Sequence, residues 1–488
     1  MPKPKAVNND VPKTAEAKKR RRKPKKNEDG VSDGKKVKME TYLTPGEEVE
    51  KIRLKGSTVA GELLFCGGTN WDLTGRSQVP KHARVPGSSP IGGRNLWSPH
   101  RLSALSGVRV KAVFSGPVAC HTLLVTEEGK AMSWGRNDKE QLGHCDAIRR
   151  DTPTLIETLK DYTLVEAACG RNHTLCLTNE GEVFAFGENK FGQLGLGFQC
   201  EGNKDEKTSI GKPQKILYDG QPITRVACGG DFSMVVDLKG RLYSFGHPEY
   251  SQLGHDNDGQ YFVTSKKVTF DCQLVPKRIQ LYIERTREGQ VKPLTGVLIK
   301  DVVCGVNHTV ALDIQKRVFT WGFGGYGRLG HQGPKDEAVP RILKPFDMPN
   351  RGVKSIHGGS AYSMAVTEFG MLFFWGQAKT TGEATMYPKP VQDLNGWNIR
   401  SVGCSNRSIV IAADESLISW GPSPTYGELG YGENGPRSST CAKEVKTVEG
   451  IFIHSVACGY GHTVMLARDD ETEEKEKIQK LPVFTPTP

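Results

Sequence analysis

The sequence lacks any long hydrophobic run. No apolar stretch in the 488 residues approaches the roughly 18 to 20 residues that cross a membrane as a helix, and no hydrophobic region near the first residue is typical of a secretory signal. The hydrophobic content of 36% is modest and fits short strands and turns, which the 56 glycines also favour. We therefore expect a soluble intracellular protein.

Aromatic residues are almost absent from the strongly basic N-terminal stretch. Residues 1–38 hold 14 Lys and Arg against 5 Asp and Glu, a net charge of +9 out of +11, so the other 450 residues carry only +2. Such a segment cannot bury enough apolar surface to fold alone, and we predict a disordered basic tail over residues 1–50. It can act as a nuclear-import signal, a phosphate-binding arm or both, and the alternative is a merely solvated tail. The residues with this predicted role are Lys18, Lys19, Arg20, Arg21, Arg22, Lys23, Lys25 and Lys26.

A glycine-anchored segment recurs seven times at intervals of 45 to 76 residues, which indicates one repeat array rather than several domains. In each copy a hydrophobic stretch ends in an aromatic residue or Cys followed by Gly. In most copies a Gln/Arg/Glu-Leu-Gly turn closes 8 residues later. The seven anchor glycines are Gly67, Gly135, Gly187, Gly246, Gly322, Gly376 and Gly421.

The second half of the repeat reads Cys-Gly-x-x-His-Thr followed by an apolar residue. Its His position, 14 residues before the next anchor glycine in the first six copies, is taken by His121, His173, Phe232, His308, Tyr362, Arg407 and His462. The chain opens on the glycine half and closes on the histidine half. A closed ring explains this phase, because the first and last strands must then share a blade.

The cysteines follow the same repeat. Cys169, Cys228, Cys304 and Cys458 stand 4 residues before the His position, and Cys404 sits one residue off. A residue that recurs at one site of a repeat indicates a packing role, since free Cys is small and readily buried. Because nothing in the sequence is typical of a secreted protein, we expect reduced thiols.

Each unit predicts a small antiparallel sheet of about four strands. In the third unit residues 173–178 and 183–186 flank the turn Asn179-Glu180-Gly181, which is a hairpin signature. A Pro-x-x-apolar element follows, and this strand is expected at an edge because proline cannot donate to a central ladder. The predicted fold is an all-β, seven-bladed β-propeller over residues 51–467, closed by N- and C-terminal strands that share one blade. We expect residues 468–488 to form a short charged tail outside the ring.

The repeated Cys-Gly-x-x-His-Thr, Trp-Gly and Gly-Gln-Leu-Gly elements resemble those of the regulator of chromosome condensation superfamily, over roughly residues 60–467. The resemblance to one member of this superfamily is closer still, over residues 64–75, residues 420–425 and the basic tail. It implies a protein of cell division that binds small GTPases of the Rac, Ral or Arf kind on one propeller face. It also implies a location in the nucleus and nucleolus, at chromosomes and centromeres, on the spindle and its midzone, and partly in the cytoplasm, with a role in cytoskeletal control.

Three functions remain open at this point. The first is a GTPase-regulating interaction protein of mitosis, expected to be a monomer. The second is a guanine-nucleotide exchange factor, which shifts a GTPase toward its nucleotide-free form without making or breaking bonds. We do not find the acidic, glycine-containing wedge insertion of the exchange-active relative, so whether this chain is an enzyme stays open. The third is a chromatin or microtubule adaptor driven by the basic tail.

Two motifs that resemble chemical sites are better explained by the repeat. Residues 322–327 match Gly-x-Gly-x-x-Gly, but another turn follows instead of the helix that would hold a pyrophosphate. The Cys-x-x-x-His pairs would be metal ligands only across a sharp turn, and Phe232 and Tyr362 cannot replace a ligand. We therefore expect the histidines to pack and hydrogen-bond within each blade, and we predict no catalytic, cofactor or metal site.

Departures from the repeat are the candidate binding sites. The longest interval runs from Gly246 to Gly322 and contains about 13 extra residues around 282–293, with residues 284–290 as a hairpin tip. The alternative is a solvated loop. The candidate partner-binding residues in this basic insertion are Lys266, Lys267, Lys277, Arg278, Arg285 and Arg287.

Two further features lie outside the repeats. A second insertion, residues 76–97, is expected to be a flexible surface loop. Thr44, which precedes Pro45, is a candidate proline-directed phosphorylation site, and phosphate there would weaken anion binding by the neighbouring basic tail.

Overall fold

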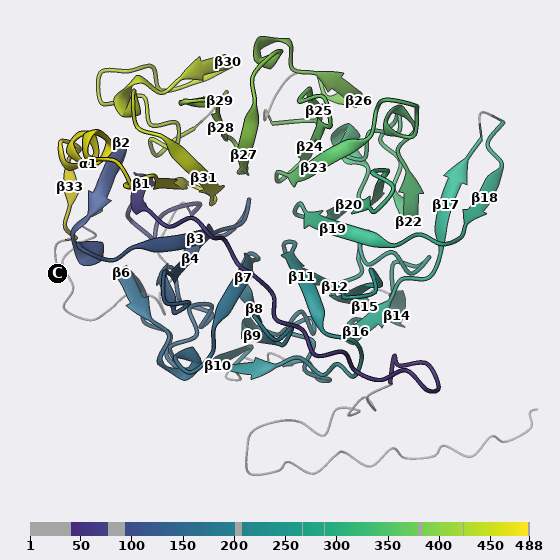
Figure 1. Ribbon diagram of the computed structural model, residues 1–488. Helices are drawn as coiled ribbons and strands as arrows, with labels where there is room; N and C mark the ends of the chain where they lie inside the picture. The colour runs from purple at the N-terminus through teal and green to yellow at the C-terminus, as the bar shows by residue number, and fades with distance from the viewer. Residues whose placement is uncertain are drawn as a thin grey trace, which may run out of the picture.

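Strands make up nearly all of the regular structure in this computed structural model, which describes residues 41–76, 93–200, 207–265, 267–286, 288–378, 383–422 and 424–486. They form seven blades around a central channel (Figure 1). The predicted all-β, seven-bladed propeller is therefore confirmed. Of the predicted basic tail, residues 1–50, the first 40 residues with all of the nuclear-import residues lie outside the described residues.

Each of the first three blades is a four-stranded antiparallel sheet. Blade 1 contains β3 (Val110–Phe114), β4 (His121–Thr126), β5 (Ala131–Gly135) and β6 (Arg150–Leu155). Blade 2 contains β7 (Leu164–Cys169), β8 (His173–Thr178), β9 (Val183–Glu188) and β10 (Ser209–Lys215). Blade 3 contains β11 (Ile223–Cys228), β12 (Phe232–Asp237), β13 (Leu242–Gly246) and β16 (Gln273–Arg278).

Blades 4 to 6 repeat this plan. Blade 4 contains β19 (Ile299–Cys304), β20 (His308–Asp313), β21 (Val318–Gly322) and β22 (Glu337–Ile342). Blade 5 contains β23 (Val353–Gly358), β24 (Tyr362–Thr367), β25 (Leu372–Gly376) and β26 (Thr385–Pro390). Blade 6 contains β27 (Ile399–Cys404), β28 (Ile409–Ala413), β29 (Ser416–Gly421) and β30 (Ser439–Glu444). The proline-bearing strands β6, β10, β16 and β26 are the outermost in their sheets, as predicted, whereas β22 of blade 4 is paired in parallel on its outer side by a further strand.

Blade 7 closes the ring with strands from both ends of the chain. Its order is β31 (Ile453–Cys458), β32 (His462–Ala467), β1 (Glu62–Gly68), β2 (Asn95–Leu102) and β33 (Val483–Phe484). The central pairing joins Phe65 to Val464 and Gly67 to His462. The shared blade predicted from the phase of the repeat is thus present.

The end of the chain is part of blade 7 and not a tail outside the ring. The helix α1 (Thr472–Gln479) packs the fully buried Ile478 against the blade, and Arg468 bonds the Glu474 carboxylate. β33 then pairs in parallel with β2. The prediction for residues 468–488 missed this because only a few apolar residues, widely spaced among charges, carry the contacts.

The histidines of the repeat form hydrogen bonds to side chains of the neighbouring blade. His121 Nε2 lies 2.9 Å from Thr174 Oγ1 in the next blade, and that hydroxyl donates to the Gln141 carbonyl. Because the hydroxyl proton is used on the carbonyl, His121 donates its Nε2–H. The equivalent links join His173 to Ser233, His308 to Ser363 and His462 to Thr122. The histidines therefore bond between blades, and the expectation that they bond within each blade is wrong.

The histidine itself explains both glycines of the repeat. A Cβ on Gly170 would lie 2.2 Å from the His173 ring, so the Cys-Gly pair leaves room for the imidazole. The anchor Gly187 pairs with His173 across the hairpin, has φ of +106°, and would place a Cβ 2.4 Å from the Asn172 carbonyl oxygen. The two half-motifs thus meet at one crowded point.

Blade 6 departs from the repeat at a different residue than the sequence spacing predicts. Cys404 pairs with Ile409 as Cys304 pairs with Thr309, so Ser408, not Arg407, occupies the His position. The turn between β28 and β29 is one residue shorter than in the other blades, which breaks the 14-residue spacing. The same correction brings Cys404 into register with the other repeat cysteines. Tyr362 of blade 5 consequently bonds the backbone carbonyl of Ser408.

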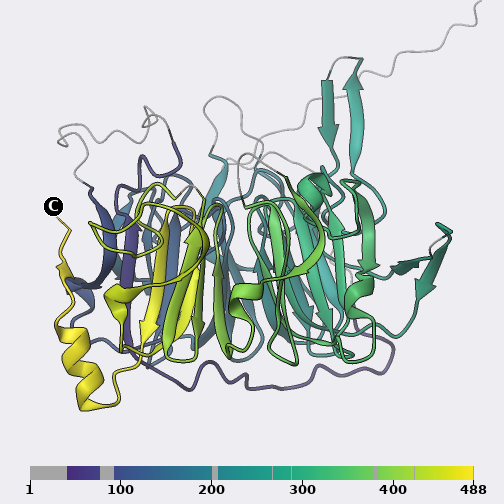
Figure 2. The same ribbon diagram turned by 90° about the horizontal axis from the view of Figure 1, so that it is seen from above.

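Residues 41–60, which we name the strap, run as an extended segment along one face of the ring before β1 begins (Figures 1 and 2). Leu54 donates its amide to the Asn179 carbonyl, and Gly61 forms a bridge with Val110. The boundary expected at residue 50 does not separate a tail from the propeller, because residues 41–50 already contact blade 3. None of the described helices is long and apolar enough to cross a membrane.

Candidate functional site

Two hairpins interrupt the repeat, one within blade 3 and one between blades 3 and 4. The first pairs β14 (Gln260–Thr264) with β15 (Lys267–Phe270), and the second pairs β17 (Tyr282–Arg285) with β18 (Val291–Leu294). The blade strand β16 lies between them in the chain. Figure 2 shows that β14–β15 stands off the face opposite the strap, whereas β17–β18 leaves the rim of the ring. The hairpin tip predicted at residues 284–290 is confirmed, because Thr286 bonds Gln290 across it.

The β14–β15 hairpin presents large apolar side chains to solvent. Exposed fractions are 50% for Tyr261, 69% for Phe262, 54% for Val263 and 40% for Val268. Both faces of a two-stranded ribbon are bare here, and such a ribbon is only marginally stable in water by itself. Exposed apolar surface of this kind is typical of a site that another protein covers.

Aromatic contacts fix the base of the β14–β15 hairpin. The Phe270 ring lies 4.9 Å from the His247 ring, which lies 4.1 Å from the Phe191 ring. Burial lowers the pKa of His247 to about 4, so the imidazole is neutral near pH 7. Asp271 also bonds the Gly259 carbonyl across the base. The base of the hairpin is therefore held by ring packing and a hydrogen bond, and the rest of the hairpin projects from it.

A second group of rings continues this face toward blade 4. Tyr250 and Phe323 lie 4.8 Å apart, and the buried Arg328 guanidinium stacks over Phe323 at 4.6 Å. The side chain of Tyr326 is 55% exposed above the same guanidinium. Burial lowers the pKa of Arg328 to about 10, which leaves it charged. Apolar, aromatic and cationic groups therefore meet beside the β14–β15 hairpin, a combination enriched at protein interfaces.

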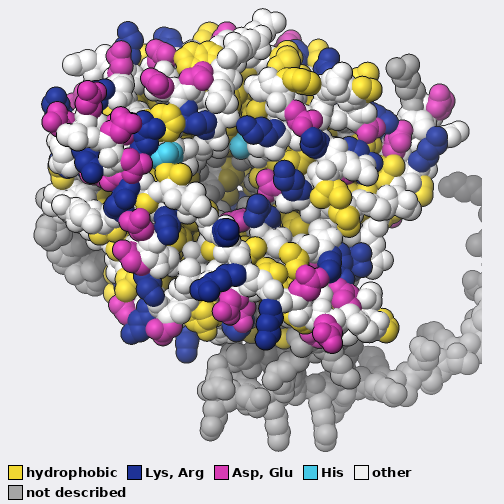
Figure 3. Space-filling view, viewed as in Figure 1, with side chains coloured by type: hydrophobic (Ala, Val, Ile, Leu, Met, Phe, Trp, Pro, Cys, Tyr) yellow, Lys and Arg dark blue, Asp and Glu magenta, His cyan; other side chains and the backbone are white. Residues whose placement is uncertain are grey.

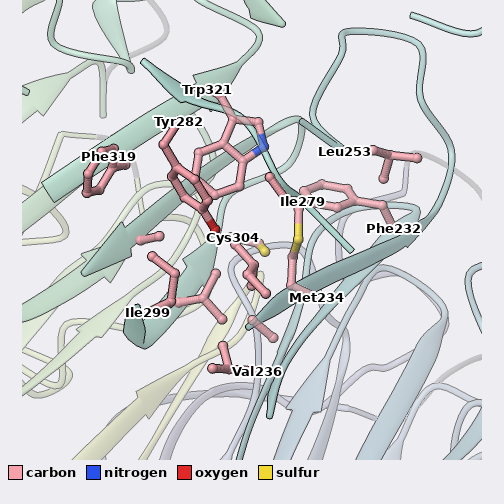
Figure 4. Packing of buried hydrophobic residues seen from close by; sticks show 14 of the residues in the cluster. Phe232, Met234, Val236, Leu253, Ile279, Tyr282, Ile299, Cys304, Phe319 and Trp321 are labelled. Carbon is pink, nitrogen blue, oxygen red and sulfur yellow. The ribbon is translucent and has the colours of Figure 1, made fainter. Parts of the chain in front are cut away.

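The β17–β18 hairpin is anchored in the core instead. Tyr282 and Ile283 are buried, and the Tyr282 ring packs edge-on against Phe319 at 5.4 Å. Figure 4 shows Tyr282 among residues of blades 3 and 4, including Ile279 and Trp321. Arg285 pairs with Glu337 at 3.2 Å, and Arg341 shares that carboxylate at 2.7 Å. This hairpin therefore seals the junction between two blades.

The structure distributes the predicted basic residues over three places. Lys267 is on the β14–β15 hairpin, Lys277 and Arg278 are on the outermost strand of blade 3, and Arg285 is on β17. Lys266 and Arg287 lie outside the described residues. The sequence reasoning followed the charges and missed Tyr261, Phe262 and Val263. Their signal was an apolar triplet between Gly259 and Cys272 in a unit that already had its four strands.

The remaining candidates have simple structural explanations. Residues 325–327 form a single tight 3-10 turn, and no helix follows them. Among the described residues, no group of three His, Cys, Asp or Glu side chains is placed to hold a metal. The central channel contains a cavity of 280 Å³ whose lining includes Glu166. Arg225 lies 3.5 Å from the Glu166 carboxylate, and burial raises the pKa of Glu166 to about 7. The strap face shows basic and acidic side chains intermingled around a central hollow (Figure 3).

The two features outside the repeats are only partly described. Thr44 is exposed on the strap. Of the second insertion, residues 77–92 lie outside the described residues, while Arg76 pairs with Asp138 at 2.5 Å.

Comparison with known proteins identifies the repeat. The sequence model of the RCC1-like domain family matches residues 62–465. The chain is 56% identical to Protein RCC2 of Homo sapiens over 442 residues, which cover 91% of this chain and 83% of the relative. Crystal structures with the same fold include human WBSCR16, with a TM-score of 0.64 at 20% identity, covering 84% of this chain and 100% of that one. They also include Prp20p of Saccharomyces cerevisiae, with a TM-score of 0.62 at 21% identity, covering 87% and 95%.

Proposed function

Because the chain belongs to the RCC1-like domain family, we propose that it is a regulator of small GTPases that docks its partner on the face carrying the β14–β15 hairpin. The exposed apolar hairpin is the observation that carries this proposal. Prp20p, which shares the fold, is described with binding properties to Gsp1p and histones. A family resemblance of this kind supports a GTPase partner, and GTPases of the Rac, Ral or Arf kind are the ones to test.

The hairpin has the chemistry of an interface centre. Aromatic side chains dominate the binding energy of interfaces, and the rings of Tyr261 and Phe262 are exposed and available for a partner to cover. The ribbon stands on a rigid ring, so docking it costs little backbone entropy. A projection of this kind can enter a cleft of the partner, whereas the flat strap face cannot.

Exchange activity is the finer form of the proposal. A ribbon that enters the nucleotide site of a GTPase would favour its nucleotide-free form and thereby speed release. A ribbon that binds elsewhere would leave release unchanged and make the protein a scaffold or an inhibitor. Both forms require the same apolar contact and differ only in what the contact does.

The experiment measures binding and release of labelled nucleotide from a panel of magnesium-loaded GTPases. The variant Y261S/F262S removes the exposed rings, and V291S on the β17–β18 hairpin is the control because Val291 is about as exposed as Tyr261. Faster release that Y261S/F262S abolishes would support an exchange factor. Binding without faster release would support a scaffold. Binding by no GTPase, or binding that Y261S/F262S leaves intact, would contradict the proposal.

A second candidate function rests on the net charge of +9 in residues 1–38. We propose chromatin or microtubule attachment through this tail, and with it the nuclear, chromosomal and spindle location and the role in mitosis. Each neutralised phosphate of DNA would contribute about −0.9 to the slope of log affinity against log salt. Deleting residues 1–38 should remove a steep salt dependence and leave GTPase binding unchanged. Salt-independent attachment, or attachment without the tail, would contradict this second proposal.

A further inference from the structure

The strap is held on blade 3 by one aromatic contact and one polar cluster. The Tyr42 ring stacks on Tyr218 at 5.9 Å and meets the edge of Tyr243 at 5.0 Å, while its hydroxyl donates to the Pro276 carbonyl at 2.5 Å. Its amide donates to the Asp219 carbonyl. Tyr218 and Tyr243 would be uncovered if this part of the strap left the blade.

Thr44 lies at the first position of a tight turn directly after this contact. The Glu47 amide donates to the Thr44 carbonyl at 2.8 Å, Pro45 occupies the second position, and Gly46 has φ of +84°. These are the residues that a type II turn favours. The Glu47 carboxylate folds back and accepts from both the amide and the hydroxyl of Thr44, at 2.9 and 2.8 Å. The hydroxyl of Thr44 is thus a donor that the turn uses.

Glu47 is the residue through which the turn holds the ring. Its Oε1 accepts from Arg241 at 3.1 Å and from the fully buried Gln221 amide at 2.9 Å. Gln221 also donates to the Glu48 carbonyl and accepts from the Glu50 amide. Hydrogen bonds from Thr44, Gln221 and Arg241 lower the pKa of Glu47 to about 2, so it is ionised near pH 7.

The surroundings of Thr44 are acidic. Arg241 already serves two carboxylates, because its Nε donates to Asp237 at 2.6 Å and its terminal nitrogens face Glu47. Lys239, in the turn between β12 and β13, pairs with Glu50. Residues 41–50 carry three glutamates and no Lys or Arg. A new anion at Thr44 would therefore compete with Glu47 and Asp237 for Arg241, and Lys239 is already paired with Glu50.

We propose that Thr44 is a phosphorylation site and that its phosphate releases the strap from blade 3. A proline-directed kinase would transfer the γ-phosphoryl group of a nucleoside triphosphate to Thr44 Oγ1. The Oγ1–P bond forms as the bond from the γ-phosphorus to the diphosphate leaving group breaks, and the hydroxyl proton passes to the base of the kinase.

Phosphorylation would turn the attraction between the Thr44 side chain and the Glu47 carboxylate into repulsion. The hydroxyl proton now shared with Glu47 is replaced by a group of charge about −1.5 to −2 at hydrogen-bond distance from an ionised carboxylate. Glu47 must then leave Arg241 and Gln221, and the turn opens. Release uncovers Tyr218 and Tyr243 and opens a cavity of 630 Å³ between the strap and blades 2 and 3, whose lining includes Val49, Ile52, Ile216 and Pro222. This surface is on the face opposite the β14–β15 hairpin.

The test is amide hydrogen exchange of the full chain after treatment with a proline-directed kinase and ATP, with the modified sites identified by mass spectrometry. Exchange at the Tyr42, Glu47 and Leu54 amides should rise about tenfold or more, while amides of blade 5 stay protected. Unmodified Thr44, or equal or slower exchange after its modification, would overturn the proposal. The second result would mean that Arg241 captures the phosphate.

Two variants separate charge from damage. T44V accepts no phosphate, so its strap should stay protected after kinase treatment even if Thr152 or Thr485, which also precede proline, is modified. T44E should loosen the strap, and T44E/E47Q should restore part of the protection because the facing carboxylate is gone. Equal exchange in T44E and T44E/E47Q would contradict the repulsion on which the proposal depends.

Discussion

The two hairpins on either side of β16 are similar in length and charge but opposite in their attachment. β17–β18 buries Tyr282 and Ile283 in the blade junction and pairs Arg285 with Glu337. β14–β15 leaves Tyr261, Phe262 and Val263 in solvent and is fixed only at its base. The difference indicates that the β17–β18 hairpin is part of the ring and that the β14–β15 hairpin is available to a partner. Net charge over the insertion could not have separated them, since what distinguishes them is the burial of their apolar residues.

The largest expected effect is on stability, from the anchored hairpin. Tyr282→Ala removes a fully packed ring from the junction of blades 3 and 4 and should lower the free energy of unfolding by about 3–5 kcal/mol. Denaturant unfolding monitored by intrinsic fluorescence measures it. A loss below about 1 kcal/mol would mean that the hairpin is not part of the core.

The ring on which both hairpins stand should weaken in acid. Burial lowers the pKa of His173 to about 3 from its ordinary 6.5, so the unfolded chain binds more protons between these values. The stability that neutral His173 contributes above pH 6.5 is therefore lost as the pH falls toward 3. His173→Phe, which copies Phe232 in the next blade, should reduce the loss between pH 7.5 and 5.5 by about 1 kcal/mol. An unchanged loss, measured by unfolding at both pH values, would contradict a buried neutral imidazole.

A smaller effect is expected from the ion pair of the anchored hairpin. Arg285→Ala should cost about 0.5–1 kcal/mol, because the pair is partly exposed and Arg341 still neutralises Glu337. Its control is Lys267→Ala on the other hairpin, which makes no ion pair among the described residues and should cost nothing measurable. Equal losses of stability in the two variants would contradict the conclusion that the Arg285 ion pair helps to attach the β17–β18 hairpin to the ring.

The smallest effect on stability should come from the residue with the largest proposed effect on binding. Phe262→Ser should change the free energy of unfolding by less than about 0.5 kcal/mol, since the ring is exposed. Thermal unfolding compared with Tyr282→Ala gives the contrast directly. A large destabilisation by Phe262→Ser would assign the β14–β15 hairpin to the ring and weaken its proposed role in docking.

The repeat made most of the fold predictable. Anchor glycines and histidines recur at fixed spacing, and the crowding of Gly170 and Gly187 against His173 explains why both residue types are needed together. The spacing failed at Arg407, because a turn one residue shorter moves Ser408 into the His position. The candidate site was less predictable. The sequence located the insertion and its tip, but it could not separate residues whose side chains are buried by other blades from those that are not.

The sequence by itself determined the number of blades, the antiparallel hairpins within them and the closure of the ring, because each of these follows from short-range patterns repeated seven times. Only the tertiary structure decided that the histidines link neighbouring blades, that the strap lies on blade 3 and that the end of the chain completes blade 7. It also decided that the two hairpins leave the ring on different sides. These features depend on single contacts between residues far apart in the chain, such as Tyr42 with Pro276 and Arg101 with Val483, and no repetition marks them in the sequence.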